Sequence, residues 1–163
     1  MNNDKDYLDE LGVVALGSRL KRLSESVMGD AMVVYKYMGQ NMQPKWFTLI
    51  SLLHDKKSMS IVRAAKSLGL TQPCISQYSN ELIKLGLVKV TADNNDRRRK
   101  VMSLTAKGES KYQKLLPIKL AIEKAAISIC AEVDQNFYLA IQQFEKALMK
   151  KSLYQRALEN YHE

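Results

Sequence analysis

The sequence contains few of the residues on which redox, metal and catalytic sites are built. Among its 163 residues are two cysteines and two histidines. Cys74 and Cys130 stand far apart, so they provide neither zinc-site spacing nor a disulfide framework, and free thiols in a reducing compartment are expected. His54 and His162 are not placed to pair with a nucleophile. We therefore predict a protein that is not an enzyme and that binds no metal or cofactor.

Long hydrophobic runs, flexible linkers and repeats are also missing. No apolar run approaches the ~18 residues needed to span a bilayer, and the first ten residues, MNNDKDYLDE, are too acidic for a signal peptide. The expected location is the cytoplasm, without contact with a membrane. Because 46% of the residues are hydrophobic, the chain should form a globular body rather than remain disordered.

The excess of positive charge is confined to the middle of the chain. Residues 44–108 carry 12 Lys and Arg against 4 Asp and Glu, and this net +8 equals the formal net charge of the whole protein. The flanking residues 1–43 and 109–163 have net charges of −1 and +1. A localised excess of this kind favours a nucleic-acid partner over a general effect on solubility.

Residues 44–86 have the pattern of three short helices. Pro44 suits the first turn of the first helix, whose many apolar residues predict a central place in the core. Ser60 can cap the second helix, and Thr71 can cap the third, which spans 72–85. One side of the third helix carries side chains that donate and accept hydrogen bonds, the chemistry that base-edge reading in a major groove requires. These are Gln72, Ser76, Gln77, Asn80 and Lys84, with Pro73 in the first turn.

The next segment reads as a hairpin with a cationic tip. Apolar and polar residues alternate over 87–90 and 101–104, and the Asx-rich segment between them suits a turn. Four consecutive cations, Arg97, Arg98, Arg99 and Lys100, follow Asp96. Alternate residues of an extended strand point to opposite faces, so at most half of this run can enter one groove. The order of helices and hairpin predicts a mostly α fold with a small β-hairpin wing, the winged helix-turn-helix.

Long helices are predicted on both sides of this module. The pattern over 7–38 is helical, with Gly29 as a candidate interruption, and Thr105 can cap a helix that Pro117 must kink or break. A last helix should start near Asp134. Together these helices have more apolar surface than a winged-helix core can cover, so we expect a second copy of the chain to bury it. The predicted division is a DNA-binding lobe over 44–108 between dimerisation regions over 1–43 and 109–163.

With these residues in view, the chain resembles the MarR family of bacterial transcription regulators. The matching pieces are Leu85-Gly86-Leu87-Val88, Asp96-Arg97-Arg98 and Leu104-Thr105-Ala106-Lys107-Gly108. The segments LGSRLKRLSESVM and PKWFTLISLL also look like the DNA-binding half of relatives fused to a GNAT acetyltransferase. We find no acyl-CoA-binding loop of the R/QxxGxG/A type, so no acetyltransferase domain is expected.

The resemblance implies a homodimeric repressor that binds a pseudo-palindromic site in double-stranded DNA. The helix 72–85 would enter the major groove, while Arg98, held by Asp96, would reach the minor groove. Phosphate contacts are expected from the other wing cations and from residues at helix ends. The candidates are Arg97, Arg99, Lys100, Ser60, Thr71 and Lys84.

Two further roles stay open at this point. The resemblance implies a small, often aromatic or anionic, effector, and Tyr35, Trp46 and Tyr112 are candidates to line its cleft, although core packing explains each of them more simply. Cys74 stands in the first turn of the groove helix, where a thiolate would be stabilised. It is a candidate redox switch, with packing beneath the DNA-facing surface as the alternative.

The competing interpretation is a winged-helix module that binds protein or RNA. A polar helix face and a cationic hairpin argue against a purely protein interface. An A-form major groove does not admit a helix. Duplex DNA is therefore the favoured partner.

Overall fold

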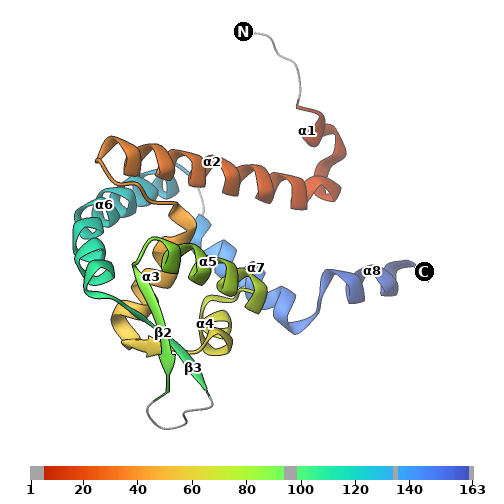
Figure 1. The fold of residues 1–163 in the computed structure, drawn as a ribbon. Helices are drawn as coiled ribbons and strands as arrows, with labels where there is room; N and C mark the ends of the chain where they lie inside the picture. Colours follow the sequence, from red (N-terminus) through yellow and green to blue (C-terminus); the bar gives the residue numbers. More distant parts are fainter. Residues whose placement is uncertain (1–5, 94–98, 134–135, 162–163) are drawn as a thin grey trace. The chain divides into compact units, whose positions relative to one another are not determined.

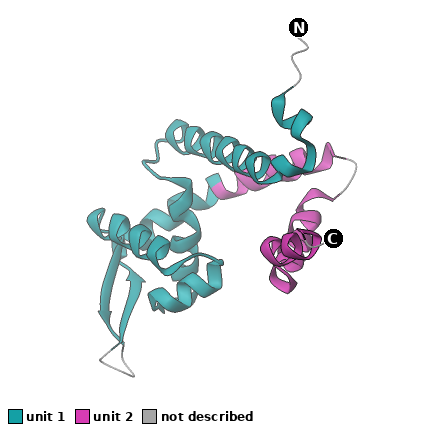
Figure 2. Ribbon diagram, turned by 90° about the vertical axis from the view of Figure 1, so that its right-hand side faces the viewer, with its two compact units in different colours: residues 1–118 teal, residues 119–163 magenta. Residues whose placement is uncertain are grey.

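Helices and one small antiparallel sheet make up the computed structural model, which describes residues 6–93, 99–133 and 136–161 (Figure 1). The chain divides into two units, residues 1–118 and 119–163 (Figure 2). In order, the elements are α1 (Tyr7–Leu11), the 3₁₀ turn η1 (Gly12–Ala15), α2 (Leu16–Tyr37), α3 (Pro44–Lys56), β1 (Ser58–Met59), α4 (Ile61–Leu68), α5 (Gln72–Lys84), β2 (Val88–Ala92), β3 (Lys100–Leu104), α6 (Ala106–Ala131), α7 (Phe137–Lys150) and α8 (Leu153–Tyr161).

The predicted winged helix-turn-helix is confirmed in the first unit. Strands β2 and β3 form an antiparallel hairpin in which Val88 pairs with Leu104 and Ala92 with Lys100. Two residues of β1 pair with the other side of β3, so the strand order is β1-β3-β2. Helices α3, α4 and α5 pack together above the base of the hairpin, which extends away from them (Figure 1).

The two short helices of the module begin and end where their capping residues predict. The Ser60 hydroxyl accepts a hydrogen bond from the Arg63 N–H at the start of α4, and the Thr71 hydroxyl accepts one from the Cys74 N–H at the start of α5. Gly69 ends α4 in the left-handed region, at φ 65° and ψ 26°, where a residue without a Cβ is unstrained. These local signals set the turn between the two helices.

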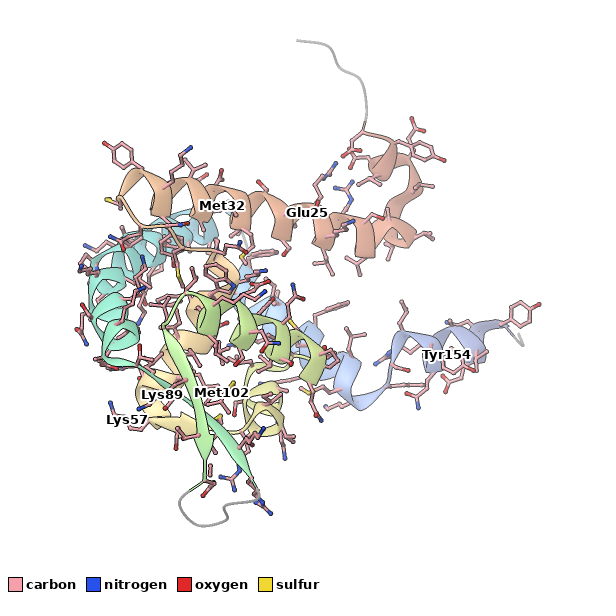
Figure 3. All side chains as sticks on the ribbon, viewed as in Figure 1. Glu25, Met32, Lys57, Lys89, Met102 and Tyr154 are labelled. Carbon is pink, nitrogen blue, oxygen red and sulfur yellow. The ribbon has the colours of Figure 1, made fainter. Side chains whose placement is uncertain are left out.

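The core of the first unit is built around α3, as the apolar character of this helix predicts. It contacts α2, α4, α5 and the sheet. The hairpin contributes to this core through Met102 of β3, which is only 1% exposed, whereas Lys89 of β2 is exposed to solvent (Figure 3). The largest fully buried side chains come from α3, α5, β3 and α6. They are Leu49, Ile50, Leu53, Ile75, Leu82, Met102 and Leu115.

The N-terminal helical segment breaks at a different glycine from the one expected. Gly29 lies inside an uninterrupted α2, whereas Gly12 ends α1 and is the first residue of η1. Gly12 has φ 60° and ψ −139°, a conformation that no α-helix contains. A helical glycine such as Gly29 costs only ~0.5–1 kcal/mol relative to alanine, so the surrounding helix tolerates it.

Helix α6 begins as predicted but passes through its proline. The Thr105 hydroxyl accepts a hydrogen bond from the Gly108 N–H, which caps the helix. The helix then continues across Pro117 without a break, so of the predicted kink or break only a kink is compatible with it. Pro117 removes one backbone donor from the helix, and the boundary between the two units follows at residues 118 and 119.

The second unit contains two final helices rather than one. Asn136 caps α7 by accepting from the Leu139 N–H, while the predicted start at Asp134 lies outside the described residues. Lys151 is extended, and Ser152 exchanges hydrogen bonds with Gln155 in a reciprocal cap that starts α8. In the described part of the chain, no helix combines the length and the apolar character of a membrane span.

Candidate nucleic-acid interface

Helix α5 has one buried side and one polar, exposed side. Ile75, Ser79 and Leu82 are buried against the rest of the unit. Ser76 is half-buried. The other predicted groove residues of this helix and its cap are exposed. They are Thr71, Gln72, Pro73, Gln77, Asn80 and Lys84. The structure thus brings together the side chains that could approach base edges and phosphates.

Glu81 is the best-connected side chain of α5, and sequence reasoning did not single it out. Its carboxylate accepts hydrogen bonds from Lys45 Nζ at 3.1 Å, from Trp46 Nε1 at 2.5 Å and from Gln77 Nε2 at 3.0 Å. These three donors, Lys45 foremost, lower the pKa of Glu81 to about 2. The contact between Gln77 and Glu81 could have been predicted from the sequence, because residues four apart lie on the same face of a helix. The contact of Glu81 with α3 could not, because it depends on how the two helices pack.

The ammonium group of Lys45 lies over two aromatic rings. It is 5.9 Å from the ring centre of Trp46 and 5.3 Å from that of Tyr78, within the range of a cation–π contact. Interaction with the thiol of Cys74, together with burial, raises the pKa of Tyr78 to about 12. Cys74 is a half-buried free thiol. A continuous set of contacts therefore joins the start of α3 to the middle of α5.

The wing is described on both sides of its tip. The Asp93 N–H donates to the Arg99 carbonyl at 2.8 Å, which extends the hairpin ladder beyond the strands. Arg99 and Lys100 are exposed. The predicted minor-groove pair Asp96 and Arg98, together with Arg97, lies outside the described residues.

A polar groove of about 430 Å³ runs between the sheet and the start of α4. Three cations from three different segments line it: Arg63, Lys89 and Arg99. Hydroxyl groups fill much of the remaining wall, and one carboxylate, that of Asp93, also lines it. The hydroxyl residues are Ser58, Ser60, Thr91 and Ser103. Cations and hydroxyls beside a helix N-terminus suit a phosphate group.

The three aromatic residues considered for an effector cleft are buried in the first unit. Tyr35 is 3%, Trp46 7% and Tyr112 8% exposed. Burial raises the pKa of Tyr35, and the ring of Tyr112 stacks on His54 with centres 4.0 Å apart. Each side chain thus packs in the core, and a role in ligand binding stays a prediction. The open cavities nearby are lined by the α2–α3 connection, residues 39–43, and by lysines of α6.

Several solved structures that share this architecture bind DNA. The repressor CouR, bound to a 23-mer DNA duplex, superposes with a TM-score of 0.63 at 21% identity, covering 85% of this chain and 96% of its own. A mutant of E. coli MarR complexed with operator DNA gives 0.62 at 15% identity, covering 83% and 98%. BpsR of Bordetella bronchiseptica, whose DNA binding is regulated by 6-hydroxynicotinic acid, gives 0.59 at 18% identity, covering 79% and 91%.

No protein-family model matches the sequence. The fold itself is a winged helix-turn-helix flanked by long helices. More narrowly, it is the fold of the MarR-family transcription regulators. Similarity at identities of 21% and below shows a shared fold. The function has to be inferred from the residues of the candidate interface.

Proposed function

We propose that this chain is a MarR-type regulator that binds specific sequences in double-stranded DNA as a homodimer, most simply as a repressor. The observations that carry the proposal are the exposed polar face of α5 and, in the same unit, the cationic groove between the sheet and the start of α4. Duplex DNA offers base edges to the hydrogen-bonding side chains of α5 and phosphates to the cations of the groove. We assign the protein to the cytoplasm and give it no catalytic role.

In this proposal α5 lies in the major groove. Gln72, Ser76 and Gln77 face base edges, where each good amide–base pair is worth ~1–3 kcal/mol of discrimination. Ser60 and Thr71 face phosphates at helix starts. Fold relatives bound to DNA duplexes support this placement.

The tip of the wing completes the contact. Arg98 enters the minor groove and Asp96 orients its guanidinium, while Arg97, Arg99 and Lys100 contact phosphates or solvent. Alanine at Arg98 is expected to weaken binding more than alanine at Arg97. Equal losses in titrations against one duplex would remove the special role of Arg98.

The homodimer is supported by apolar surface that the monomer leaves open. The described residues of the second unit include no buried side chain, although Phe137, Phe144 and Tyr154 belong to it. Tyr154 is labelled in Figure 3. Helix α2 carries a further stripe formed by Leu16, Leu20, Leu23 and Val27, each 38–61% exposed. A twofold pair of chains buries both surfaces and presents two copies of α5 to half-sites about one helical turn apart.

A small aromatic or anionic effector would release the DNA, as the regulation of BpsR by 6-hydroxynicotinic acid suggests. Tyr35, Trp46 and Tyr112 are the proposed lining of its cleft. A panel of aromatic carboxylates, added to the preformed DNA complex, tests this part: release of DNA with a rise in melting temperature supports it. Release by none of them counts against the cleft but leaves DNA binding standing.

Selection of bound duplexes from a random pool tests the main proposal. The expected result is a pseudo-palindrome with half-sites ~10 bp apart. If each protomer contacts ~4 phosphates, the logarithm of the binding constant should fall with the logarithm of salt concentration at a slope near −7. Failure to enrich any duplex, a slope shallower than about −2, or preferential competition by duplex RNA would contradict it.

A further inference from the structure

We propose that Glu81 sets the base preference of Gln77 by fixing which atom of the Gln77 amide faces the DNA. This inference rests on the proposed function, since it specifies how one residue of α5 reads a base. It makes Glu81 a positioning residue, because its carboxylate acts through Gln77 rather than on the DNA itself.

The chemistry of the contact determines the orientation of the amide. Gln77 Nε2 lies 3.0 Å from Glu81 Oε1. An ionised carboxylate can only accept hydrogen bonds, so the amide atom that faces it has to be the nitrogen. The flipped amide would place the Gln77 oxygen against a carboxylate oxygen and exchange a charge-assisted hydrogen bond for a repulsion.

Glu81 can hold Gln77 because the body of the protein holds Glu81. Lys45 Nζ is 2.9 Å from Glu81 Oε2, and the Trp46 indole donates to the same oxygen at 2.5 Å. Both donors belong to α3, whose Leu49 and Ile50 are fully buried. These donors, with Gln77, also lower the pKa of Glu81 to about 2, so the carboxylate is ionised near neutral pH.

The fixed amide favours particular bases. With its nitrogen turned to Glu81, the amide presents Oε1 as an acceptor, and the second hydrogen of Nε2 can still donate. In the major groove adenine offers an N6 donor beside its N7 acceptor, and cytosine offers an N4 donor. Guanine and thymine present acceptors to an amide oxygen. We expect adenine first, cytosine second, and guanine and thymine last at the position that Gln77 reads.

A different role for Glu81 predicts a different result. If the carboxylate only ties α5 to α3, its loss weakens binding to every duplex by the same factor. If it orients Gln77, its loss changes the ratio between bases. A free glutamine amide can flip and pair with acceptors or donors, so the preference should relax.

The experiment uses the full-length protein and four duplexes that differ at one base pair. The selected operator supplies the duplexes, and Gln77→Ala identifies the position whose preference disappears. For the unmodified protein we expect adenine over guanine by roughly 5- to 100-fold. For Glu81→Gln we expect the same ratio to fall below about threefold. The matched control is Lys84→Met, which removes an exposed cation from the same helix but leaves the Gln77–Glu81 bond and its anchors on α3 in place, and it should keep the ratio.

A measurement on the unmodified protein guards against a variant that fails to fold. Purine, placed at the same position, lacks the N6 amino group that would donate a hydrogen bond to Gln77 Oε1. 7-Deazaadenine keeps this group but lacks the N7 acceptor. The purine duplex should bind more weakly than the 7-deazaadenine duplex. The inference is overturned if Glu81→Gln keeps the full preference, or if only the 7-deaza duplex binds weakly. A protein that enriches no duplex at all refutes the proposed function instead.

Discussion

The indole N–H of Trp46 and the carboxylate of Glu81 form a 2.5 Å hydrogen bond between the central helix α3 and the helix that faces the proposed DNA. Trp46 is buried and Glu81 is half-buried, so the bond anchors an accessible helix to the interior. Because the chain has one tryptophan, the state of this bond can be followed through a single indole signal.

The Trp46–Glu81 bond should survive mild acid. Its partners lower the pKa of Glu81 to about 2 in the folded protein, against an ordinary value of 4.5. A depressed folded pKa gives a stabilising contribution that is fully present above pH 4.5 and is lost as the pH falls toward 2. The Trp46 indole N–H resonance should therefore stay unchanged from pH 6 to pH 3.5 while the protein remains folded. A titration of this signal centred near pH 4.5 would contradict the assignment.

Gly108→Ala should destabilise the protein. A Cβ at Gly108 would lie 2.0 Å from the Leu87 carbonyl oxygen, a backbone atom that cannot turn aside. We expect a loss of ~1–3 kcal/mol or more in the free energy of unfolding, measured by urea denaturation. The matched control is Gly29→Ala in α2, where a Cβ meets nothing within 4 Å, and this variant should gain ~0.5–1 kcal/mol. Equal effects of the two changes would show that the Gly108 contact is not rigid.

Ser60→Asp should separate DNA binding from stability. Aspartate keeps the N-cap of α4, so the free energy of unfolding should change little. Its charge faces the groove that Arg63, Lys89 and Arg99 line, and it should lower affinity for duplex DNA roughly tenfold, or ~1.4 kcal/mol. Ser60→Ala provides the comparison: it loses the cap, at ~1 kcal/mol of stability, but repels no phosphate. If the alanine variant binds DNA as weakly as the aspartate variant, no phosphate lies at this groove.

Leu23→Glu should dissociate the proposed dimer. Leu23 is half-exposed in the apolar stripe of α2, and a carboxylate there would be buried without a partner in a dimer. Sedimentation at micromolar concentration should show a shift from dimer to monomer, with loss of DNA binding. Ser18→Glu, on the opposite side of the same helix, should leave both unchanged. A dimer that persists in the Leu23 variant would move the interface away from α2.

The parts of the fold that local signals determine could be predicted from the sequence. Ser60, Thr71 and Thr105 cap helices where expected, and the alternation around the basic run gives the two strands of the hairpin. Backbone geometry within a helical pattern was harder to predict. Gly12 and Gly29 look alike in sequence, and only the first adopts a positive φ.

The candidate site could be predicted only in part. The exposed face of α5 follows from the period of the helix. The role of Glu81 does not, because it depends on Lys45 and Trp46, which lie 36 and 35 residues away along the chain. The alternation of its strands, its Asx-rich turn and its charge drew attention to the wing, whereas the hydrogen bonds of Glu81 form only when the chain folds.

The anchoring of Glu81 also limits how α5, the proposed DNA-reading helix, could be exchanged between proteins of this fold. A graft of α5 alone would place a foreign residue 81 beside Lys45 and the buried indole of Trp46. Without a carboxylate there, the indole N–H would lose its acceptor and the grafted helix its anchor. A graft that is meant to transfer a new specificity has to include positions 45 and 46 together with α5. These two segments are distant in the sequence. A chimaera that receives only one of them should fold less stably and bind DNA less selectively.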